Sequence, residues 1–446
     1  YYTINYILRE YNVPAEKMDN EVWDYIFLGK GDPKKIAKSK GIPLEVLVKA
    51  REEFDYWYPL DSRHSGKDLI KNHLTFFIFN HTGIFPREKW PRQIVVYGYV
   101  LYRGQKMSKS LFNVIPVARL ARQLSPDGLR LTIALASEID QDLDFREEAA
   151  YSIIEQLRRI HGMIEEFSNI IREYREKSIP KTLQLEDSWV LSKLKERLDY
   201  AEKALDESRI RDAGNIIFYI LEEDVKKYLE VLKVKGRYLD EVAKHIIAYI
   251  FDAWIRAMSP YTPFFAEEMW RKIGGKEFVV NTLWPKVEEE LYSEKALLAF
   301  EYVDRLISDV REIVKVRKMK PKKILIHVVK PVEYTELRRA IEYFEEGKPM
   351  KEFIRDLIAE AKDKRATSIR ARQLYEYVST LSPPIRALIR KISLDEKKII
   401  EALNEWIKAQ IEAPIEVYYY DEKEAPIIGK KKTSLPLKPA IYIEFE

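Results

Sequence analysis

The chain has 446 residues, of which 46% are hydrophobic and 33% charged, and its formal net charge is +4. This length exceeds one ordinary core, so we expect two or three domains. The sequence has no cysteine, which excludes disulfides, thiolate nucleophiles and zinc–thiolate sites. Its six histidines show no metal-ligand spacing, so no metal site is predicted.

The composition also bears on the setting in which the protein works. No stretch of the sequence approaches 18 consecutive apolar residues and no secretory leader is recognisable, so we expect an intracellular, cytoplasmic protein without a membrane segment. The charged share is high against a typical value of about 25%, and only 15 residues are glycine, which suggests heat adaptation. Because the net charge is small, any polyanion must be bound by local basic patches.

Residues 1 to 176 mix helical and strand-like patterns, which favours an α/β domain. The Val- and Tyr-rich stretch RQIVVYGYVLY predicts two short strands on either side of Gly98. Further on, SPDGLRLTIALA predicts a helix with Ser125 as its N-cap and Pro126 at its first position. Residues 177–187 contain a proline that interrupts the pattern, and we interpret them as a linker.

The rest of the chain is predicted to form two further domains. Residues 187–290 carry amphipathic helices, and residues 291–446 alternate helices with strands at 323–329, 415–420 and 440–445. Ser393 and Glu396 match a capping box. The apolar helical face expected after this box consists of Ile399, Ile400, Leu403 and Trp406.

A short loop rich in hydrogen-bond donors follows the first strand pair. The string KMSKS places Lys106 and Lys109 three residues apart. Ser108 lies between the two lysines, and Ser110 follows the second. In a tight turn both ammonium groups can converge on one small anion while the hydroxyls also donate. A mobile lysine charge suits oxygens that gain charge during a reaction. The alternative interpretation is a solvated basic turn.

A second candidate segment lies upstream, in HSGKDLIKNH at residues 64–73. Gly66 permits close approach of the backbone, Asp68 can accept from ribose hydroxyls, and His73 follows further along the same segment. Asp68 and His73 are equally compatible with a helix cap and a polar pair in the core.

Three basic clusters in the last domain are candidates for RNA binding, because lysine and arginine contacts to phosphates supply most of the salt-sensitive affinity of such proteins. They span residues 315–323, 362–372 and 430–432. The lysines singled out are Lys318, Lys320, Lys322, Lys430, Lys431 and Lys432. Taken singly, each cluster is also compatible with ordinary solvated surface.

The KMSKS string, placed after a strand pair and before a helix, resembles the second signature of class I aminoacyl-tRNA synthetases. In that family the loop closes over ATP, and its second lysine stabilises the pyrophosphate leaving group. The resemblance implies Lys106 and Lys109 as catalytic residues, and ATP with Mg²⁺ as substrate and counter-ion, with no tightly bound cofactor. The residues implied for ATP binding are Lys106, Met107, Ser108, Lys109, Ser110, Gly66, Asp68 and His73.

Other segments narrow the resemblance to the leucyl-tRNA synthetases of the archaeal and eukaryal type. The stretches at 1–11, 54–81 and 431–444 are similar to segments of that family. SEIDQDLDFREE, at 137–148, resembles the stem-contact segment, and MSPYTPFFAEEMW, at 258–270, resembles a landmark of the helical tRNA-binding domain in the Leu/Ile/Val/Met subgroup. The implied partners are tRNA(Leu), leucine and ATP.

The implied fold is the C-terminal half of a class I α/β nucleotide-binding fold, followed by an α-helical bundle and a small α+β domain. The implied domains are a catalytic part with the KMSKS loop and stem-contact segment at 1–176, an anticodon-binding-type helical domain at 187–290, and a tRNA-binding domain at 291–446. By the same resemblance the C-terminal end, with Lys438, Ile443 and Glu444, lies against a tRNA loop; it is also compatible with a plain edge strand.

Two departures from the family pattern are visible. No His-x-Gly-His string and no inserted editing domain are recognisable, so we expect a fragment or one subunit of a split enzyme, inactive alone, with the missing N-terminal portion as a partner. Leu111-Phe112-Asn113 stands where the family has Lys-Gly-Asn, and Phe112 disfavours the positive φ that glycine adopts easily. Two alternatives stay open, namely a non-catalytic tRNA-binding paralogue and a class I synthetase for isoleucine, valine or methionine.

Overall fold

The computed structural model describes residues 2–107, 110, 112–361, 363–422, 425–426 and 434–446. The chain forms two compact units, one made of Tyr1–Leu120 with Thr132–Ala149 and the other of Ala121–Leu131 with Ala150–Glu446. The predicted fold class is confirmed, since an α/β part precedes a helical bundle and a C-terminal domain with a small sheet. No helix in the described ranges is long and apolar enough to cross a membrane.

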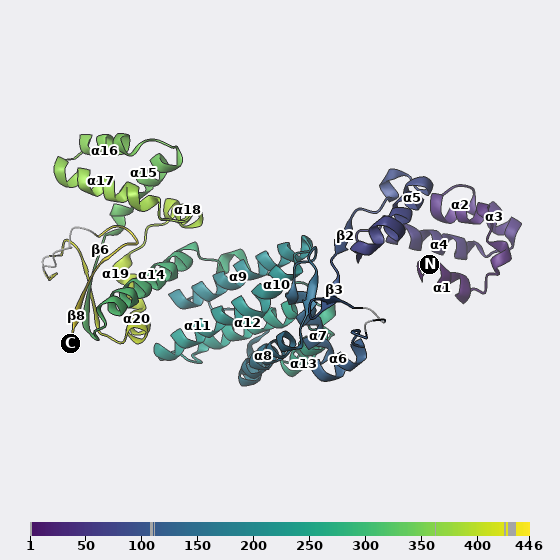
Figure 1. Ribbon diagram of the computed structural model, residues 1–446, viewed down its shortest axis with the longest axis horizontal. Coiled ribbons are helices and arrows are strands. Elements are labelled where there is room, and N and C mark those ends of the chain that lie inside the picture. The colour runs from purple at the N-terminus through teal and green to yellow at the C-terminus, as the bar shows by residue number, and fades with distance from the viewer. Residues whose placement is uncertain (1, 108–109, 111, 362, 423–424, 427–433) are drawn as a thin grey trace. The chain divides into compact units, whose positions relative to one another are not determined.

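The first unit begins with four helices that enclose a core of their own (Figure 1). They are α1 (Tyr2–Glu10), α2 (Asn20–Leu28), α3 (Pro33–Lys40) and α4 (Leu44–Trp57). Asp19 and Asp32 cap α2 and α3 by accepting from the backbone N–H groups of Val22 and Lys34. Fully buried members of this core include Ile7, Val22, Ile26, Val46, Leu47 and Phe54. The first 57 residues are therefore helical, without the strand contribution expected for an evenly mixed domain.

A strand–helix–strand unit follows these helices. Strand β1 (Arg63–Gly66) pairs in parallel with β2 (Ile94–Tyr97), and α5 (Thr75–Ile84) is the crossover helix between them. A short 3-10 turn (Lys67–Leu69) and a π turn (Ile70–Leu74) lead from β1 into α5. This arrangement places the end of β1 and the segment after it beside the end of β2.

A second small sheet carries the base of the KMSKS loop. Its strands are β3 (Val100–Tyr102), β4 (Gln105–Lys106) and β5 (Leu143–Phe145), in the order β4-β3-β5. Arg103 and Gly104 both adopt positive φ, at 50° and 76°, so β3 and β4 are joined by the tight two-residue turn that suits the twist of a hairpin.

The two strands predicted around Gly98 are present, but they belong to different sheets. Gly98 lies where the chain passes from one sheet to the other, against the backbone of Gln141 and Asp142. A Cβ at this position would lie 2.1 Å from the carbonyl oxygen of Gln141, so only glycine fits.

Long helices dominate the second unit. Helices α6 (Val117–Leu124) and α7 (Pro126–Ala136) each have residues in both units. Helix α7 begins as predicted, and the Ser125 Oγ accepts from the N–H of Gly128 at 3.0 Å. The helical bundle consists of α8 (Glu147–Tyr174), α9 (Leu185–Asp206), α10 (Ile210–Asn215), a π turn (Ile216–Ile220), α11 (Leu221–Val234), α12 (Glu241–Met258) and α13 (Pro263–Lys272).

A buried ion cluster holds the beginning of α9 to the end of α11. The Arg237 guanidinium donates to Glu186 and Asp187, whose side chains are fully buried, and Tyr228 donates to Asp187 at 2.9 Å. Lys235 adds a further ion pair to Glu186 at 2.8 Å. The charges are thus paired and hydrogen-bonded, which is the condition under which buried charges are tolerated.

The C-terminal part packs helices against a three-stranded sheet (Figure 1). Strand β6 (Pro321–Val328) is central, parallel to β7 (Ile415–Tyr419) and antiparallel to β8 (Ala440–Phe445), so the three predicted strands are confirmed. The helices are α14 (Glu294–Arg317), α15 (Tyr334–Glu345), α16 (Met350–Ala359), α17 (Lys364–Val378), α18 (Pro383–Lys391), α19 (Glu396–Ala402) and α20 (Asn404–Ile411).

The capping box predicted from Ser393 and Glu396 is wrong. Asp395 caps α19 by accepting from Lys398, whereas the Ser393 hydroxyl accepts from Arg338 at 2.6 Å. The Glu396 carboxylate is fully buried and serves tertiary contacts instead. Tertiary contacts of Ser393 and Glu396 have thus replaced the local hydrogen bonds of a capping box.

Candidate active site and RNA-binding surface

Two lysines meet one aromatic ring at the base of the KMSKS loop. Lys106, in β4, places its Nζ 4.3 Å from the centre of the Tyr99 ring, and Lys67, just after β1, places its Nζ at the same distance from that ring. Tyr99 directly precedes β3, the strand with which Lys106 pairs. The ring therefore joins the segment that holds Gly66 and Asp68 to the segment that holds the signature loop, through attraction between a cation and an aromatic face.

Asp142 neutralises one of the two lysines. Its carboxylate forms an ion pair with Lys67 and also accepts the backbone N–H of Tyr99 at 2.8 Å. The hydrogen bond from Lys67, followed by that from Tyr99, holds the pKa of Asp142 below its usual range. No carboxylate in the described part of the chain forms an ion pair with Lys106, so its charge is available to an anion at the loop.

Asn113 closes the base of the loop. Its side-chain amide donates to the carbonyl oxygen of Lys106 at 3.1 Å, across the six intervening residues. Within the loop, Met107 and Ser110 are described, whereas Ser108 and Lys109 lie outside the described residues. The structure thus positions one of the two candidate catalytic lysines and the closing contact of the loop.

Phe112 adopts the conformation that its side chain disfavours. Its φ is 50°, in the left-handed region, and 96% of the residue is exposed. Phe112, which stands where the family has glycine, thus keeps a positive φ. A bulky side chain in this conformation strains the backbone of the loop.

Gly66 and Asp68 lie together at the end of β1. A Cβ at Gly66 would lie 2.6 Å from the Asp68 Oδ1 and 3.6 Å from the Tyr97 ring, so glycine is what allows the carboxylate to fold back over the strand end. The site accordingly has a bare stretch of backbone beside a carboxylate, which suits a ligand with hydroxyl donors.

His73 lies in the π turn before α5, and its contacts differ from the polar core pair with Asp68 that was one interpretation of the sequence. Its Nε2 lies 3.0 Å from a guanidinium nitrogen of Arg63, and its backbone N–H donates to the Asn72 side chain. Arg63 in turn lies over the ring of Phe77. Among the described contacts none joins His73 to Asp68, so the histidine anchors the turn to β1.

The basic residues at the end of α14 are distributed over different environments. Lys318 ends α14 in the left-handed conformation with φ 53°, and Lys320 lines a cavity of about 350 Å³ together with Lys315 and Arg311. Lys322 forms an ion pair with Glu444 at 3.3 Å, so two of the predicted RNA-contacting residues bind each other across β6 and β8.

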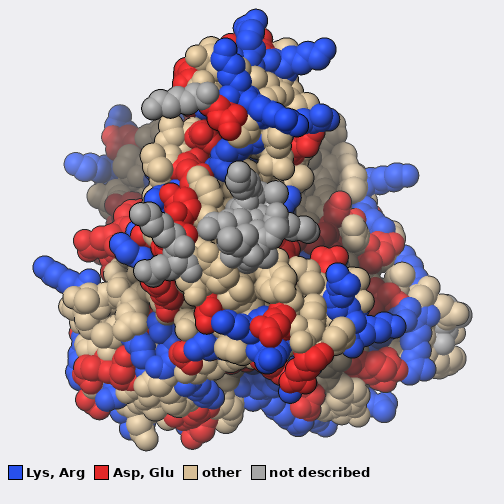
Figure 2. Space-filling view, turned by 90° about the vertical axis from the view of Figure 1, so that its left-hand side faces the viewer, with Lys and Arg blue, Asp and Glu red and all other residues tan. Residues whose placement is uncertain are grey.

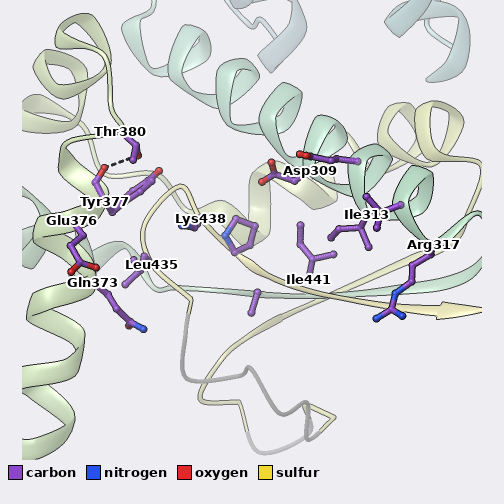
Figure 3. Close-up of a pocket in the computed structure, with 14 residues that line it drawn as sticks. Asp309, Ile313, Arg317, Gln373, Glu376, Tyr377, Thr380, Leu435, Lys438 and Ile441 are labelled. Carbon is purple, nitrogen blue, oxygen red and sulfur yellow. Dashed lines mark hydrogen bonds between the residues drawn. The ribbon is translucent and has the colours of Figure 1, made fainter.

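Lys438 lines a larger cavity, of about 730 Å³, between α14, α17 and the segment that leads into β8. Figure 3 shows Asp309 and Arg317 of α14 on one side of it and Tyr377 of α17 on the other. Burial, followed by the charge of Glu312, raises the pKa of Asp309. Three acidic residues and two basic residues line this cavity, namely Asp309, Glu312, Glu376, Arg317 and Lys438.

Strand β8 lies at the edge of its sheet, as in the interpretation of the C-terminal end as an edge strand. The Ile443 side chain is buried opposite Ile324, whereas Glu444 is exposed. Lys430, Lys431 and Lys432 lie outside the described residues. On the face at the C-terminal end of the molecule, basic and acidic side chains are intermingled, without one continuous basic patch among the atoms coloured by charge (Figure 2).

No group of three or more histidine, aspartate or glutamate side chains that could hold a metal ion occurs in the described ranges.

Comparison with known proteins shows what the chain is similar to. A model described as tRNA synthetases class I (M) matches residues 44–171, and one described as the anticodon-binding domain of tRNA ligase matches residues 187–327. A leucine–tRNA ligase of Ignicoccus hospitalis is 43% identical over 445 residues, which is 100% of this chain and 42% of the relative. Along its whole length the chain is similar in sequence to part of archaeal leucine–tRNA ligases.

Other relatives are similar over the same extent. The leucine–tRNA ligase of Pyrobaculum calidifontis is 38% identical over 100% of this chain and 44% of its own length, and leucine–tRNA ligase 2 of Sulfolobus acidocaldarius is 34% identical over 100% of this chain and 46% of its own. The chain spans less than half the length of these archaeal ligases.

Solved structures give weaker likenesses. One is a ternary LeuRS–tRNA–LeuAMS complex from Agrobacterium radiobacter K84, with a TM-score of 0.47, 18% identity, and coverage of 54% of this chain and 30% of that one. Another is Mycobacterium tuberculosis methionyl-tRNA synthetase in complex with methionyl-adenylate, with a TM-score of 0.41, 19% identity and coverage of 60% of each chain.

Three residues of the candidate site were not among those selected from the sequence: Lys67, Tyr99 and Asp142. The signal for Lys67 was visible, since it lies between the selected Gly66 and Asp68. Tyr99 and Asp142 became visible only through pairing of strands β3 and β5, which lie about 40 residues apart in the sequence.

Proposed function

We propose that this chain supplies the KMSKS-loop part and the tRNA-binding part of an archaeal-type leucine–tRNA ligase. The whole enzyme forms leucyl-adenylate from leucine and ATP and then transfers the leucyl group to tRNA(Leu). The observation that carries the proposal is the identity of 43% to a leucine–tRNA ligase over the full length of the chain. In this proposal residues 1–176 serve the nucleotide, residues 187–290 and 291–446 serve the tRNA, and the protein works in the cytoplasm.

The chemistry assigned to the loop is electrostatic. The leucine carboxylate attacks the α-phosphate of ATP, the bond between that phosphorus and the bridging oxygen breaks, and pyrophosphate leaves with the added negative charge. Lys109 stabilises the leaving pyrophosphate and Lys106 supports it from the base of the loop, with Mg²⁺ bound to the nucleotide as counter-ion. Lys106 forms no ion pair with a carboxylate in the described residues, and this together with the closing hydrogen bond from Asn113 supports the assignment.

The assigned role of the end of β1 is to bind the ribose. Gly66 leaves room beside the strand and Asp68 accepts from the sugar hydroxyls. Lys67 positions this segment against the loop, because its charge is held by Asp142 and its side chain contacts the same ring as Lys106.

The assigned role of the C-terminal domain is to bind tRNA through separate basic groups and through the exposed edge of β8. Lys318, Lys320 and the lysines at 430–432 contact phosphates, while Lys438 and the β8 backbone contact a tRNA loop. The intermingled acids mean that affinity depends on a few well-placed contacts.

The test is ATP–pyrophosphate exchange by the intact gene product with each of the twenty amino acids, followed by transfer to tRNA(Leu). We expect exchange with leucine, and Lys109→Ala to slow adenylate formation with little change in leucine binding, because the lysine acts mainly in the transition state. Exchange within twofold of the unaltered protein would refute the role of Lys109, and exchange with isoleucine, valine or methionine alone would refute leucine.

A tRNA-binding protein without adenylation activity is a second candidate, favoured by Phe112 in the strained left-handed conformation. It predicts binding of tRNA(Leu) in the absence of exchange. The same assay therefore separates the two candidates.

A further inference from the structure

A cavity of about 320 Å³ lies within the second unit, where the start of α7 meets α8 and α13. The apolar residues that line it are Pro126, Ile154, Leu157, Phe264 and Phe265. The polar residues that line it are Ser125, Asp127, Arg158, His161 and Glu268. A small cavity with apolar walls and a few polar groups is the usual form of a binding site for a small organic molecule.

Asp127 brings to this cavity a carboxylate oxygen that lacks a hydrogen bond. Only 4% of the residue is exposed. Its Oδ2 accepts from the backbone N–H of Phe265 at 2.5 Å, in the first turn of α13, whereas its Oδ1 is buried and makes no hydrogen bond within the described residues. Buried polar atoms normally have a hydrogen-bond partner, so Oδ1 marks a place where a donor belongs.

The negative charge of Asp127 is also poorly compensated. Arg130 follows on the same helix, but its guanidinium donates to the carbonyl oxygens of Pro260 and Tyr261. Burial raises the pKa of Asp127, and this effect outweighs the opposing effects of the hydrogen bond from Phe265 and the charge of Arg130. A cation at Oδ1 would compensate the charge that these contacts leave.

The other charged groups at the cavity favour a cation as well. Glu268, on α13, adds a second carboxylate, and it forms no ion pair in the part of the chain that the structure describes. Arg158 is the one arginine at the cavity, and its guanidinium is paired with Glu155. The ring of His161 can donate or accept according to its tautomer. Carboxylates without a paired cation therefore outnumber the cations that could bind an anion here.

We propose that this cavity binds a small organic cation, which carries an ammonium group on an apolar stem. The ammonium donates to Asp127 Oδ1 and is attracted by Glu268, while the stem packs against Leu157 and the exposed ring of Phe264. A purely apolar ligand would leave Oδ1 without a donor, and an anion would meet like charge. None of the lining residues is among those assigned to ATP or tRNA, so the site adds a ligand to the proposed function.

The experiment is calorimetric titration of the complete 446-residue chain with three probes of similar size. Phenethylamine carries the ammonium, phenethyl alcohol is its neutral counterpart, and phenylacetate is an anion. Asp127→Asn is the main variant, because the amide oxygen still accepts from Phe265 while the amide nitrogen replaces an acceptor by a donor. Glu268→Gln is a second variant at an exposed position, and Glu230→Gln, exposed on α11, is the matched control. Thermal unfolding establishes that each variant is folded.

We expect the amine to bind about tenfold or more tighter than the alcohol, and phenylacetate to bind most weakly, because a hydrogen bond from a charged donor is the stronger one. Asp127→Asn should remove the advantage of the amine over the alcohol, Glu268→Gln should reduce it, and Glu230→Gln should leave it unchanged. If Asp127→Asn does not fold, Glu268→Gln against Glu230→Gln decides.

Three results would overturn the proposal. Equal binding of the amine and the alcohol would show an apolar cavity without a cation site. Amine binding that both Asp127→Asn and Glu268→Gln leave unchanged would place the amine elsewhere on the chain. The absence of any heat of binding with phenethylamine would show that Asp127 is buried without a ligand.

Discussion

The Lys106 ammonium lies 4.3 Å from the centre of the Tyr99 ring. Contacts of this kind contribute about 0.5–1 kcal/mol at exposed sites, enough to orient a lysine but not to neutralise it. The ring thus aims the charge while leaving it able to attract a phosphate. Lys67 contacts the same ring but forms an ion pair with Asp142. The two lysines therefore differ in whether their charge is neutralised by this carboxylate.

We predict that Lys106→Ala lowers the rate of adenylate formation by about 10²–10³, the loss typical for one electrostatic group that acts in a transition state. Leucine binding should change little. The measurement is pre-steady-state adenylate formation in the assembled enzyme, with Lys35→Ala on the exposed surface of α3 as control. Equal rates for the two variants would show that Lys106 has no role in the chemistry.

We predict that Phe112→Gly speeds adenylate formation, because glycine adopts a φ of 50° without the cost of about 1–2 kcal/mol that other residues meet there. Phe112→Ala is the matched control, since it removes the exposed ring but retains a Cβ. If both variants have the same effect, the ring and not the backbone is responsible. If neither changes the rate, the loop already closes without penalty.

Much of this architecture was predictable from local sequence patterns. The strands at 323–329, 415–420 and 440–445 follow from apolar, β-favouring runs, and the start of α7 from Ser125 and Pro126. Local patterns failed where distant segments compete for a side chain. Glu396 has the spacing of a capping box but binds Leu437, 41 residues away, and His73 pairs with Arg63 because β1 passes beside its turn.

We predict that Gly98→Ala destabilises the first unit by more than about 1 kcal/mol, because the added Cβ would lie 2.1 Å from the Gln141 carbonyl oxygen and backbone must move. Gly162→Ala is the matched control. It lies in the middle of α8 with nothing within 4 Å of an added Cβ, so it should stabilise by about 0.5–1 kcal/mol. Denaturant unfolding of both variants provides the comparison, and opposite signs are expected.

We predict that Arg237→Met destabilises the helical bundle by about 3–5 kcal/mol, because it leaves Glu186 and Asp187 as buried charges without their guanidinium partner. Arg372→Met is the control, since its pair with Glu376 is exposed and such pairs are worth at most about 1 kcal/mol. Chemical unfolding measures both. A loss below about 1 kcal/mol for Arg237→Met would mean that Lys235 alone suffices to hold the two carboxylates.

The final prediction concerns pH. Glu396 is fully buried, accepts from the Tyr334 hydroxyl at 2.9 Å and from the backbone N–H of Leu437 at 2.8 Å, and so holds the segment before β8 in place. Burial raises the pKa of this carboxyl to about 7 from its ordinary 4.5. Between those values the folded protein keeps a proton that the unfolded chain has lost, so stability falls as pH rises through this window and levels off above it.

Glu396→Gln should remove that dependence, because the amide oxygen still accepts from both donors but does not titrate. Between pH 5 and pH 8 we expect the unaltered protein to lose about 2–3 kcal/mol more unfolding free energy than the variant, at about 1.4 kcal/mol per pKa unit. Glu401→Gln, at an exposed position of the same helix, should follow the unaltered protein. Parallel pH profiles for Glu396→Gln and the unaltered protein would show that Glu396 does not titrate in this range, and that its hydrogen bonds alone fix the C-terminal segment.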